Sequence, residues 1–318
     1  MQNFVPVKLI SDKELEEHNC LESVDQISCD PETTAFKRQA RLHQALWREK
    51  LGFPVGVNPR RPAEELGSSL KLDFARKQEK NFLNEDIQKA VHYRLECPED
   101  YQMIDENRLF SNLLSSMPMC FNLFGSLHGD LVLADRAVHR WWPDVPGKVS
   151  FFRFEWSPNR NKEGEFLENR SAFDAAFELQ MENGQCGVIG IETKYHENCK
   201  REKAPVENRL RRYEEVANKS KAFKSGAIAA IVGSELQQIW LDHLLALSML
   251  QHRTQRWHWA KFVLVHPARN PSYARAAERY LELLNDQTTF EVRTIESLLD
   301  AGALPNDLIV AFRERYFL

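Results

Sequence analysis

Two neighbouring segments of the chain alternate between apolar and other residues, and this period of two is the strongest constraint on the fold. The segment "FDAAFELQ" has apolar side chains at its odd positions from Phe173 to Leu179, and "VIGIETK" has them at Ile189 and Ile191. Such alternation is typical of strands that turn one face toward a core. Directly opposed residues of an antiparallel pair share a face, so burying both apolar sets requires odd residues to pair with odd residues.

This parity predicts the turn between the two segments. A two-residue turn at Asn183 and Gly184 would pair odd residues with even ones and expose one apolar set. A three-residue loop, Glu182 to Gly184 with Gly184 left-handed, restores the parity. The same register places Asp174 directly opposite Glu192, and puts Lys194 two residues further along that face.

The wider order of patterns predicts an α/β fold. Three consecutive strands, beginning with "VSFFRFEW", form an antiparallel meander, and the strand "KFVLVHPA" joins in parallel after helices. We expect a mixed sheet flanked by helices, preceded by a helical N-terminal part. The expected division is an acidic segment 1–35 and one domain 36–318, made of the helical part 36–148 and an α/β core over about 105–300.

Charge and composition limit the surroundings of the protein. Residues 1–35 hold eight acids against two lysines, whereas residues 36–61 hold seven bases against Glu49, within a formal net charge of −4. Basic segments in an acidic chain favour a localised anion-binding surface. The sequence has no apolar run of membrane-spanning length and no signal-peptide pattern, and its six cysteines form no CxxC pair. We therefore expect a cytoplasmic protein that does not span a membrane.

The paired carboxylates predict a metal site. Asp174 and Glu192 repel each other at close range, and Mg²⁺, which prefers oxygen ligands and keeps several waters, would relieve that repulsion. A lysine beside a metal-bound water can position it, help to deprotonate it or stabilise developing negative charge. Glu192-Thr193-Lys194 is the only Asp/Glu-x-Lys triplet in the chain. This combination suits hydrolysis of a phosphodiester.

At these residues the chain resembles the PD-(D/E)XK nuclease superfamily. The strings "SAFDAAFEL" and "GIETKYHE" match its Asp and Glu-x-Lys in type, order and placement, although Phe173 stands where that pattern has proline. Together with "LWREKLGFPVG" and "NLLSSMPMCFNLFGSL", they resemble a bacterial group of restriction-endonuclease-like proteins in the superfamily.

The resemblance implies roles for individual residues. Asp174, Glu192 and the backbone carbonyl of Thr193 would bind Mg²⁺, with Mn²⁺ as an alternative, and Lys194 would assist the attacking water. Glu155 and Glu106 are candidates for the extra acid of many members. The implied function is a DNA endonuclease in defence or repair, and a homodimer would allow both strands to be cut. The alternative is a binding or regulatory protein that keeps the fold without cleavage.

Other patterns carry weaker expectations. Arg209, Arg211 and Arg212, on the helix expected after the Glu-x-Lys strand, are candidates for phosphate contacts, against the alternative of ion pairs with Glu214 and Glu215. We interpret His243 as a core histidine, Asp242 as a surface acid, and Trp141, Trp142, Trp257 and Trp259 as packing residues. Cys186, His196 and Cys199 lack a fourth ligand and regular spacing, which disfavours a zinc cluster.

Overall fold

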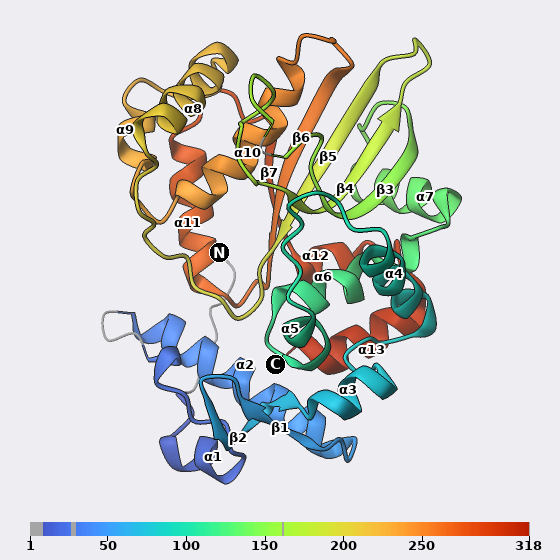
Figure 1. The fold of residues 1–318 in the computed structure, drawn as a ribbon, viewed down its shortest axis with the longest axis vertical. Coiled ribbons are helices and arrows are strands. Elements are labelled where there is room, and N and C mark those ends of the chain that lie inside the picture. The colour runs from blue at the N-terminus through green and yellow to red at the C-terminus, as the bar shows by residue number, and fades with distance from the viewer. Residues whose placement is uncertain (1–8, 27–29, 161, 318) are drawn as a thin grey trace.

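A five-stranded mixed sheet forms the centre of the protein (Figure 1). The computed structural model describes residues 9–26, 30–160 and 162–317. The strands lie in the order β3-β4-β5-β6-β7. The pairs β3–β4 and β4–β5 are antiparallel, whereas β5–β6 and β6–β7 are parallel, which confirms the predicted meander and the parallel strand. The bounds are β3 (Lys148–Trp156), β4 (Phe173–Gln180), β5 (Cys186–Thr193), β6 (Trp257–His266) and β7 (Phe290–Thr294).

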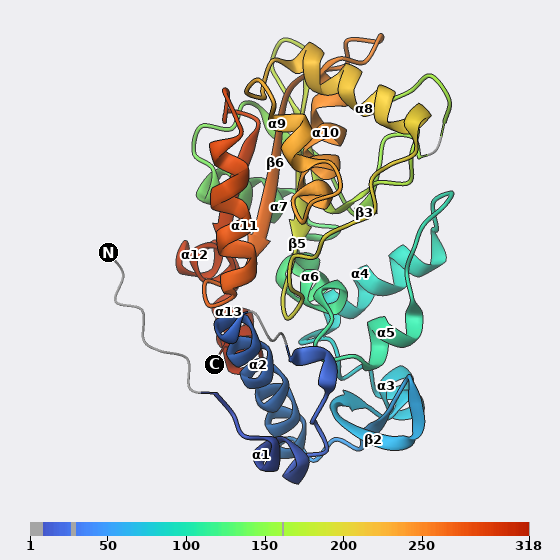
Figure 2. The ribbon, with the colours of Figure 1, turned by 90° about the vertical axis from the view of Figure 1, so that its left-hand side faces the viewer.

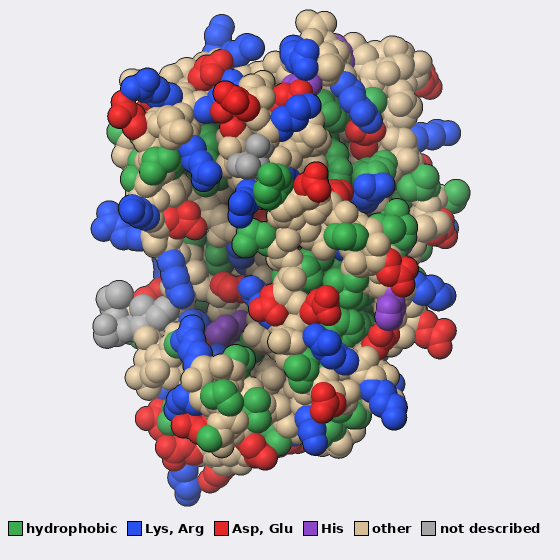
Figure 3. Space-filling model, in the orientation of Figure 1, with side chains coloured by type: hydrophobic (Ala, Val, Ile, Leu, Met, Phe, Trp, Pro, Cys, Tyr) green, Lys and Arg blue, Asp and Glu red, His purple; other side chains and the backbone are tan. Residues whose placement is uncertain are grey.

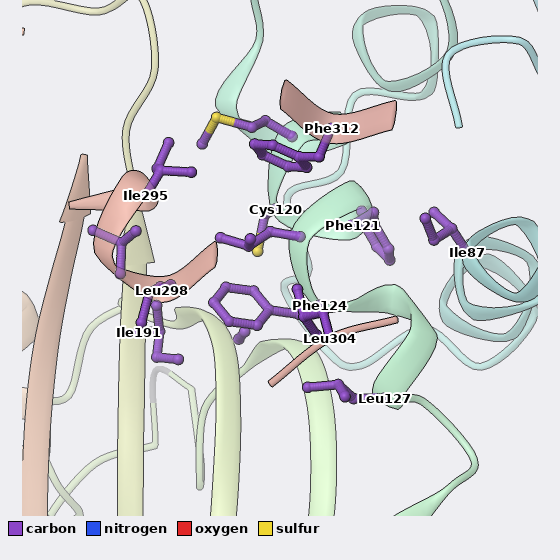
Figure 4. Packing of buried hydrophobic residues seen from close by; sticks show 14 of the residues in the cluster. Ile87, Cys120, Phe121, Phe124, Leu127, Ile191, Ile295, Leu298, Leu304 and Phe312 are labelled. Atoms are coloured by element: carbon purple, nitrogen blue, oxygen red, sulfur yellow. The ribbon is translucent and has the colours of Figure 1, made fainter. Parts of the chain in front are cut away.

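Helices cover both faces of this sheet. One core contains Ala175, Phe177, Ile189 and Ile191 and lies against α4 (Glu85–Glu96), α5 (Glu106–Ser111), α6 (Ser116–Phe124), α7 (Leu131–Trp141), α12 (Ile295–Asp300) and α13 (Asn306–Tyr316). Figure 4 shows part of it, with Cys120 and Phe124 of α6 near Ile191. The second core lies against α8 (Glu207–Ser220), α9 (Ala227–Ile231), α10 (Gln237–Leu250) and α11 (Pro271–Glu282).

The N-terminal part lies below the sheet in Figure 1 and is not purely helical. Residues 55–70 form an antiparallel hairpin of β1 (Val55–Asn58) and β2 (Arg61–Leu70). Around it lie α1 (Asp12–Glu17), the 3-10 turn η1 (Ser23–Asp25), α2 (Pro31–Lys50) and α3 (Leu72–Gln78), while the 3-10 turn η2 (Gly125–Leu127) follows α6. Pro118 lies in the first turn of α6, just after the interruption between α5 and α6, where a missing N–H costs little.

The β4–β5 loop has the predicted geometry. Gln180 pairs with Cys186, and the Met181 N–H donates to the Gln185 carbonyl at 2.9 Å, so three residues remain in the loop. Gly184 has φ +82°. Both predictions from parity are confirmed. The expected position of Phe173 is wrong, because its ring packs over Gly190 in the second core, not with Ala175. The helix layer on that side offers this large side chain a full apolar environment.

Candidate active site

The Asp174 side chain lies at the start of β4, where it is tied to the end of β5. Its Oδ2 accepts hydrogen bonds from the backbone N–H and the Oγ1 hydroxyl of Thr193, both at 2.8 Å. Ala175 pairs with Ile191, so Asp174 and Glu192 are the next residues outward in the same register. The sheet therefore brings the two acids to the same end of neighbouring strands.

Glu192 and Lys194 lie at the carboxyl end of β5 and face α10 and α11. Their side chains are 9% and 10% exposed, and Lys194 Nζ lies 2.6 Å from Glu192 Oε1. The Gln238 amide of α10 donates to the same oxygen at 2.9 Å. Lys194 Nζ also lies 5.8 Å from the centre of the Tyr273 ring on α11. Two buried ionisable groups thus meet where two helices close over the strand.

Burial and like charges shift the protonation of this cluster. Burial, and then the neighbouring Asp174 carboxylate, raises the pKa of Glu192 to about 8. Burial likewise raises the pKa of Asp174. Burial alone would lower the pKa of Lys194, but the surrounding carboxylates, Glu192 foremost, hold that pKa well above its ordinary value. The lysine is therefore a charged donor beside two acids that bind protons more tightly than usual.

The two candidates for an extra acid lie in different settings. Glu155, near the end of β3, has φ +48°, an uncommon conformation for a residue other than glycine. Its carboxylate accepts a hydrogen bond from Arg160 at 3.1 Å. Burial raises the pKa of Glu155, Arg160 lowers it, and the Asp174 carboxylate raises it further, so that the net shift is upward. Glu106 begins α5, is exposed, and lies 3.6 Å from Arg76. Of the two, only Glu155 adjoins the Asp174 carboxylate.

Asp242 is not the surface acid that the sequence suggests. It is 6% exposed, and its Oδ2 has no hydrogen-bond partner among the described residues. Burial, and then Glu192, raises its pKa well above the ordinary value. It stands one turn beyond Gln238 on α10, so both side chains face β5. Its place in the largely apolar stretch "LDHLLALSML" signals burial, but not that its side chain faces β5.

Glu197 is a further acid that sequence reasoning did not assign. It lies in the loop after β5 and accepts from the Tyr195 N–H at 2.9 Å and from the Ser116 hydroxyl of α6 at 2.8 Å. Despite burial, Lys194 and these donors hold its pKa below the ordinary value. Glu197 therefore joins the start of α6 to the strand that carries Glu192 and Lys194.

The interpretations of the remaining residues can be compared with their contacts. His243 is fully buried between the Tyr280 hydroxyl at 3.0 Å and the Thr289 hydroxyl at 2.8 Å, as expected of a core histidine. Trp141, Trp142 and Trp257 are buried, and Trp259 packs partly buried against the first core. In the described part of the chain, no three His, Cys, Asp or Glu residues are grouped as metal ligands, the zinc candidates included.

The arginines of α8 are not brought to this cluster. Both ribbon views place α8 at the top of the molecule, whereas β5 ends near its middle beside α6 (Figures 1 and 2). Arg212 donates to the Phe166 carbonyl at 2.7 Å and to Glu215 at 2.8 Å, and Arg211 pairs with Glu207. Their contact with nucleic acid remains an expectation that the geometry does not favour.

Comparison with known families decides what kind of protein carries this arrangement. A family model described as the PD-(D/E)XK nuclease superfamily matches residues 31–318. The chain belongs to the PD-(D/E)XK nuclease superfamily. Neither the curated proteins nor the solved structures searched give a match. The family match begins at the first residue of α2, so the acidic residues before Pro31 lie outside it.

One position departs from the pattern that gives the PD-(D/E)XK superfamily its name. Phe173 replaces the proline, and its ring lies so close to Gly190 that a Cβ there would come within 2.4 Å of it. Phe173 also stacks with Phe262 of β6, with ring centres 6.3 Å apart. The residue before Asp174 thus anchors β4 to the second core by packing.

Proposed function

We propose that the protein is a Mg²⁺-dependent phosphodiester hydrolase that cleaves DNA as an endonuclease. The observation that carries the proposal is the juxtaposition at the end of β4 and β5, where Asp174, Glu192 and a charged Lys194 are buried together. Buried carboxylates without enough partners are costly, and a hard cation is the chemical group that would relieve them. The superfamily match supports nuclease chemistry.

The donor set fits a hard, oxygen-loving ion. Asp174 and Glu192 would hold it together with the Thr193 backbone carbonyl, and the unpartnered buried Oδ2 of Asp242 lies on the same side of β5 as Glu192. Few protein ligands suit Mg²⁺, which usually retains several waters, and Mn²⁺ accepts the same ligands. When bound, such an ion would lower the pKa of a water and offset negative charge on the phosphate.

The protein groups have distinct tasks in this proposal. The Thr193 N–H and hydroxyl hold Asp174 in one orientation through Oδ2. Gln238 and Lys194 hold Glu192 through Oε1. Because its pKa is raised, Lys194 acts as a proton donor that orients the attacking water and stabilises charge on the phosphoryl oxygens. A lysine in this state is a poor general base.

Cleavage assays with purified protein test the proposal. Plasmid, linear and single-stranded DNA and RNA are incubated with Mg²⁺, with Mn²⁺ or with EDTA, and products are separated by electrophoresis. We expect metal-dependent cutting of DNA that Asp174→Ala, Glu192→Ala and Lys194→Ala each abolish while circular dichroism shows a folded protein. Glu182→Gln, at an exposed acid in the β4–β5 loop, is the control that retains activity. Full activity in any of the three alanine variants would contradict the assignment, and binding without cutting would favour a regulatory role.

A further inference from the structure

The acidic residues before the family domain pack on the basic face of α2. We call residues 9–26 the acidic segment and the side chains of Lys37, Arg38 and Arg41 the basic face. Arg38 donates to the Ile10 carbonyl at 2.8 Å and pairs with Asp12. Lys37 donates to the Val24 carbonyl at 2.9 Å. Each of the three bases is no more than 5% exposed, so the segment covers them.

Asp25 occupies the centre of this contact. Its carboxylate is 1% exposed and contacts three basic groups: Arg41 by an ion pair, His196 Nε2 at 2.8 Å and Lys37 Nζ at 3.6 Å. One carboxylate thus faces two positively charged side chains and an imidazole. Such an excess of donors around one anion is the arrangement that recognises phosphate as readily as carboxylate.

The basic face borders the candidate active site. His196 and Asn198 belong to the loop that directly follows Lys194, and Lys37 Nζ reaches Asn198 at 3.4 Å. Figure 2 shows α1 beside the lower part of α2, below the end of β5. Figure 3 shows Lys and Arg side chains along the side of the molecule where α11 and α2 lie, around a hollow. A polyanion that reaches the Glu-x-Lys strand would pass these surface Lys and Arg side chains.

The acidic segment has a small apolar anchor. Its buried apolar residues, Ile10, Leu15 and Cys20, form a separate cluster with Ala45 of α2. Leu21 of the segment and Leu42 of α2 pack against this cluster, and the other contacts described above are ion pairs and hydrogen bonds. The family match begins at residue 31, so it includes the basic face of α2 but not the acidic segment. The segment is thus an addition to the superfamily domain that covers this face.

We propose that the face of α2 formed by Lys37, Arg38 and Arg41 binds nucleic-acid phosphates and that the acidic segment covers it until nucleic acid displaces the segment. The inference rests on the proposed function only for the identity of the substrate as nucleic acid. Displacing Asp25 alone would leave buried bases unpaired, which is strongly unfavourable. The exchange therefore requires another anion to take its place, and a phosphate backbone supplies several at once.

Hydrogen exchange of the unmodified protein tests the displacement. Amide exchange is followed by mass spectrometry in EDTA, so that nothing is cut, with and without a duplex or single strand of about 20 nucleotides. We expect amides of residues 9–26 to exchange faster on addition of nucleic acid, while those of α8 do not change. Bound nucleic acid with unchanged protection of residues 9–26, or no binding by DNA or RNA at all, would overturn the proposal.

Charge variants of the full chain give a second measurement. Asp12→Asn with Asp25→Asn frees the bases, and we expect about tenfold tighter binding and a log K versus log salt slope steeper by about one to two units. Adding Lys37→Gln and Arg38→Gln should remove that gain. Glu16→Gln with Glu17→Gln is the matched control, because both acids lie exposed in the same segment and change the net charge equally. Equal tightening in the control would assign the effect to net charge and refute the specific surface.

These readouts separate the inference from the proposed function. Exchange and binding are measured without cleavage, so displacement can occur in a protein that never cuts. Conversely, cleavage that depends on Lys194, with a segment that stays protected, would leave the function standing and remove the inference.

Discussion

Glu178 and Glu192 are buried glutamates on adjacent central strands, one near each end of the sheet. Their electrostatic environments differ. They are 9% and 7% exposed. The two oxygens of Glu178 accept from Arg256 at 2.6 and 2.9 Å, and the Trp257 indole donates at 3.2 Å. Glu192 has Lys194 and Gln238 on one oxygen, but Asp174 and Asp242 crowd it with like charge.

The difference distinguishes a glutamate whose charge is neutralised within the fold from one whose surroundings leave its charge unbalanced. Around Glu178 the negative charge is matched by Arg256, one guanidinium nitrogen of which contacts both carboxylate oxygens, and nothing further is needed. Around Glu192 the acids outnumber the lysine. The folded chain must therefore hold either an excess of negative charge or the protons that neutralise it. Crowding of this kind costs stability and is found where a site is arranged for a ligand or a reaction.

The largest expected effect is on cleavage. Glu192→Gln should reduce the Mg²⁺-dependent rate by at least about a hundredfold to a thousandfold, as loss of a group that stabilises charge at a reaction centre does. Glu178→Gln should stay within a few fold of the unmodified protein. Initial rates on one DNA substrate measure both. A similar loss in the two folded variants would mean that the two ends of the sheet do not differ in function.

The next effect is on stability and has opposite signs at the two glutamates. Glu178→Ala should destabilise the fold by about 2 kcal/mol, because Trp257 and the partly exposed Arg256 lose a charged partner. Glu192→Gln should be neutral or stabilising in EDTA, because it removes carboxylate repulsion. Urea unfolding at pH 8 measures both changes.

The pH dependence has a definite sign. Glu192 has a pKa of about 8 in the folded protein against an ordinary 4.5. The folded state therefore holds a proton that the unfolded chain releases, and this glutamate lowers stability progressively as pH rises from about 4.5 to 8. The advantage of Glu192→Gln should grow across that window. An advantage that shrinks with rising pH would contradict the assigned cause.

A smaller loss of stability is expected at the loop that sets the register of both glutamates. Gly184 has φ +82°, and a Cβ placed there meets no atom within 4 Å, so only the backbone conformation resists a side chain. Gly184→Val should cost about 1–2 kcal/mol, and Gly184→Asn less, since asparagine tolerates left-handed geometry. Thermal unfolding of the pair measures the difference, and equal stability of both variants with the unmodified protein would show that the loop changes conformation freely.

The features of this fold that the sequence predicts are those that depend on residues close together in the chain. The register of β4 and β5 follows from alternation and one glycine, and so does the approach of Asp174 to Glu192. The hairpin of β1 and β2 escapes prediction, because "RPAEELGSSL" lacks clean alternation and much of it is exposed. The packing of the acids before Pro31 also could not be predicted, because their partners are bases of α2 that the sequence pattern does not identify.

Asp242 shows the same limit at the site itself. In sequence it lies in a largely apolar stretch beside a core histidine, and a helix pattern cannot tell which of these two neighbours has hydrogen-bond partners. In the structure His243 has a partner on each ring nitrogen, whereas Asp242 turns toward Glu192 without one for its Oδ2 among the described residues. The distinction depends on β5, which is far away in the chain.

The smallest expected effect concerns α8. Replacing Arg209, Arg211 and Arg212 by Gln together should leave DNA affinity and its salt slope nearly unchanged, because Arg211 and Arg212 are paired within the protein and α8 stands away from the end of β5. Each lost phosphate contact would instead lower the slope by about one unit. Affinities measured from low to moderate salt decide between these outcomes. A slope reduced by two or more would place the nucleic acid over the top of the sheet, beside Glu178, and would reverse the functional ranking of the two ends.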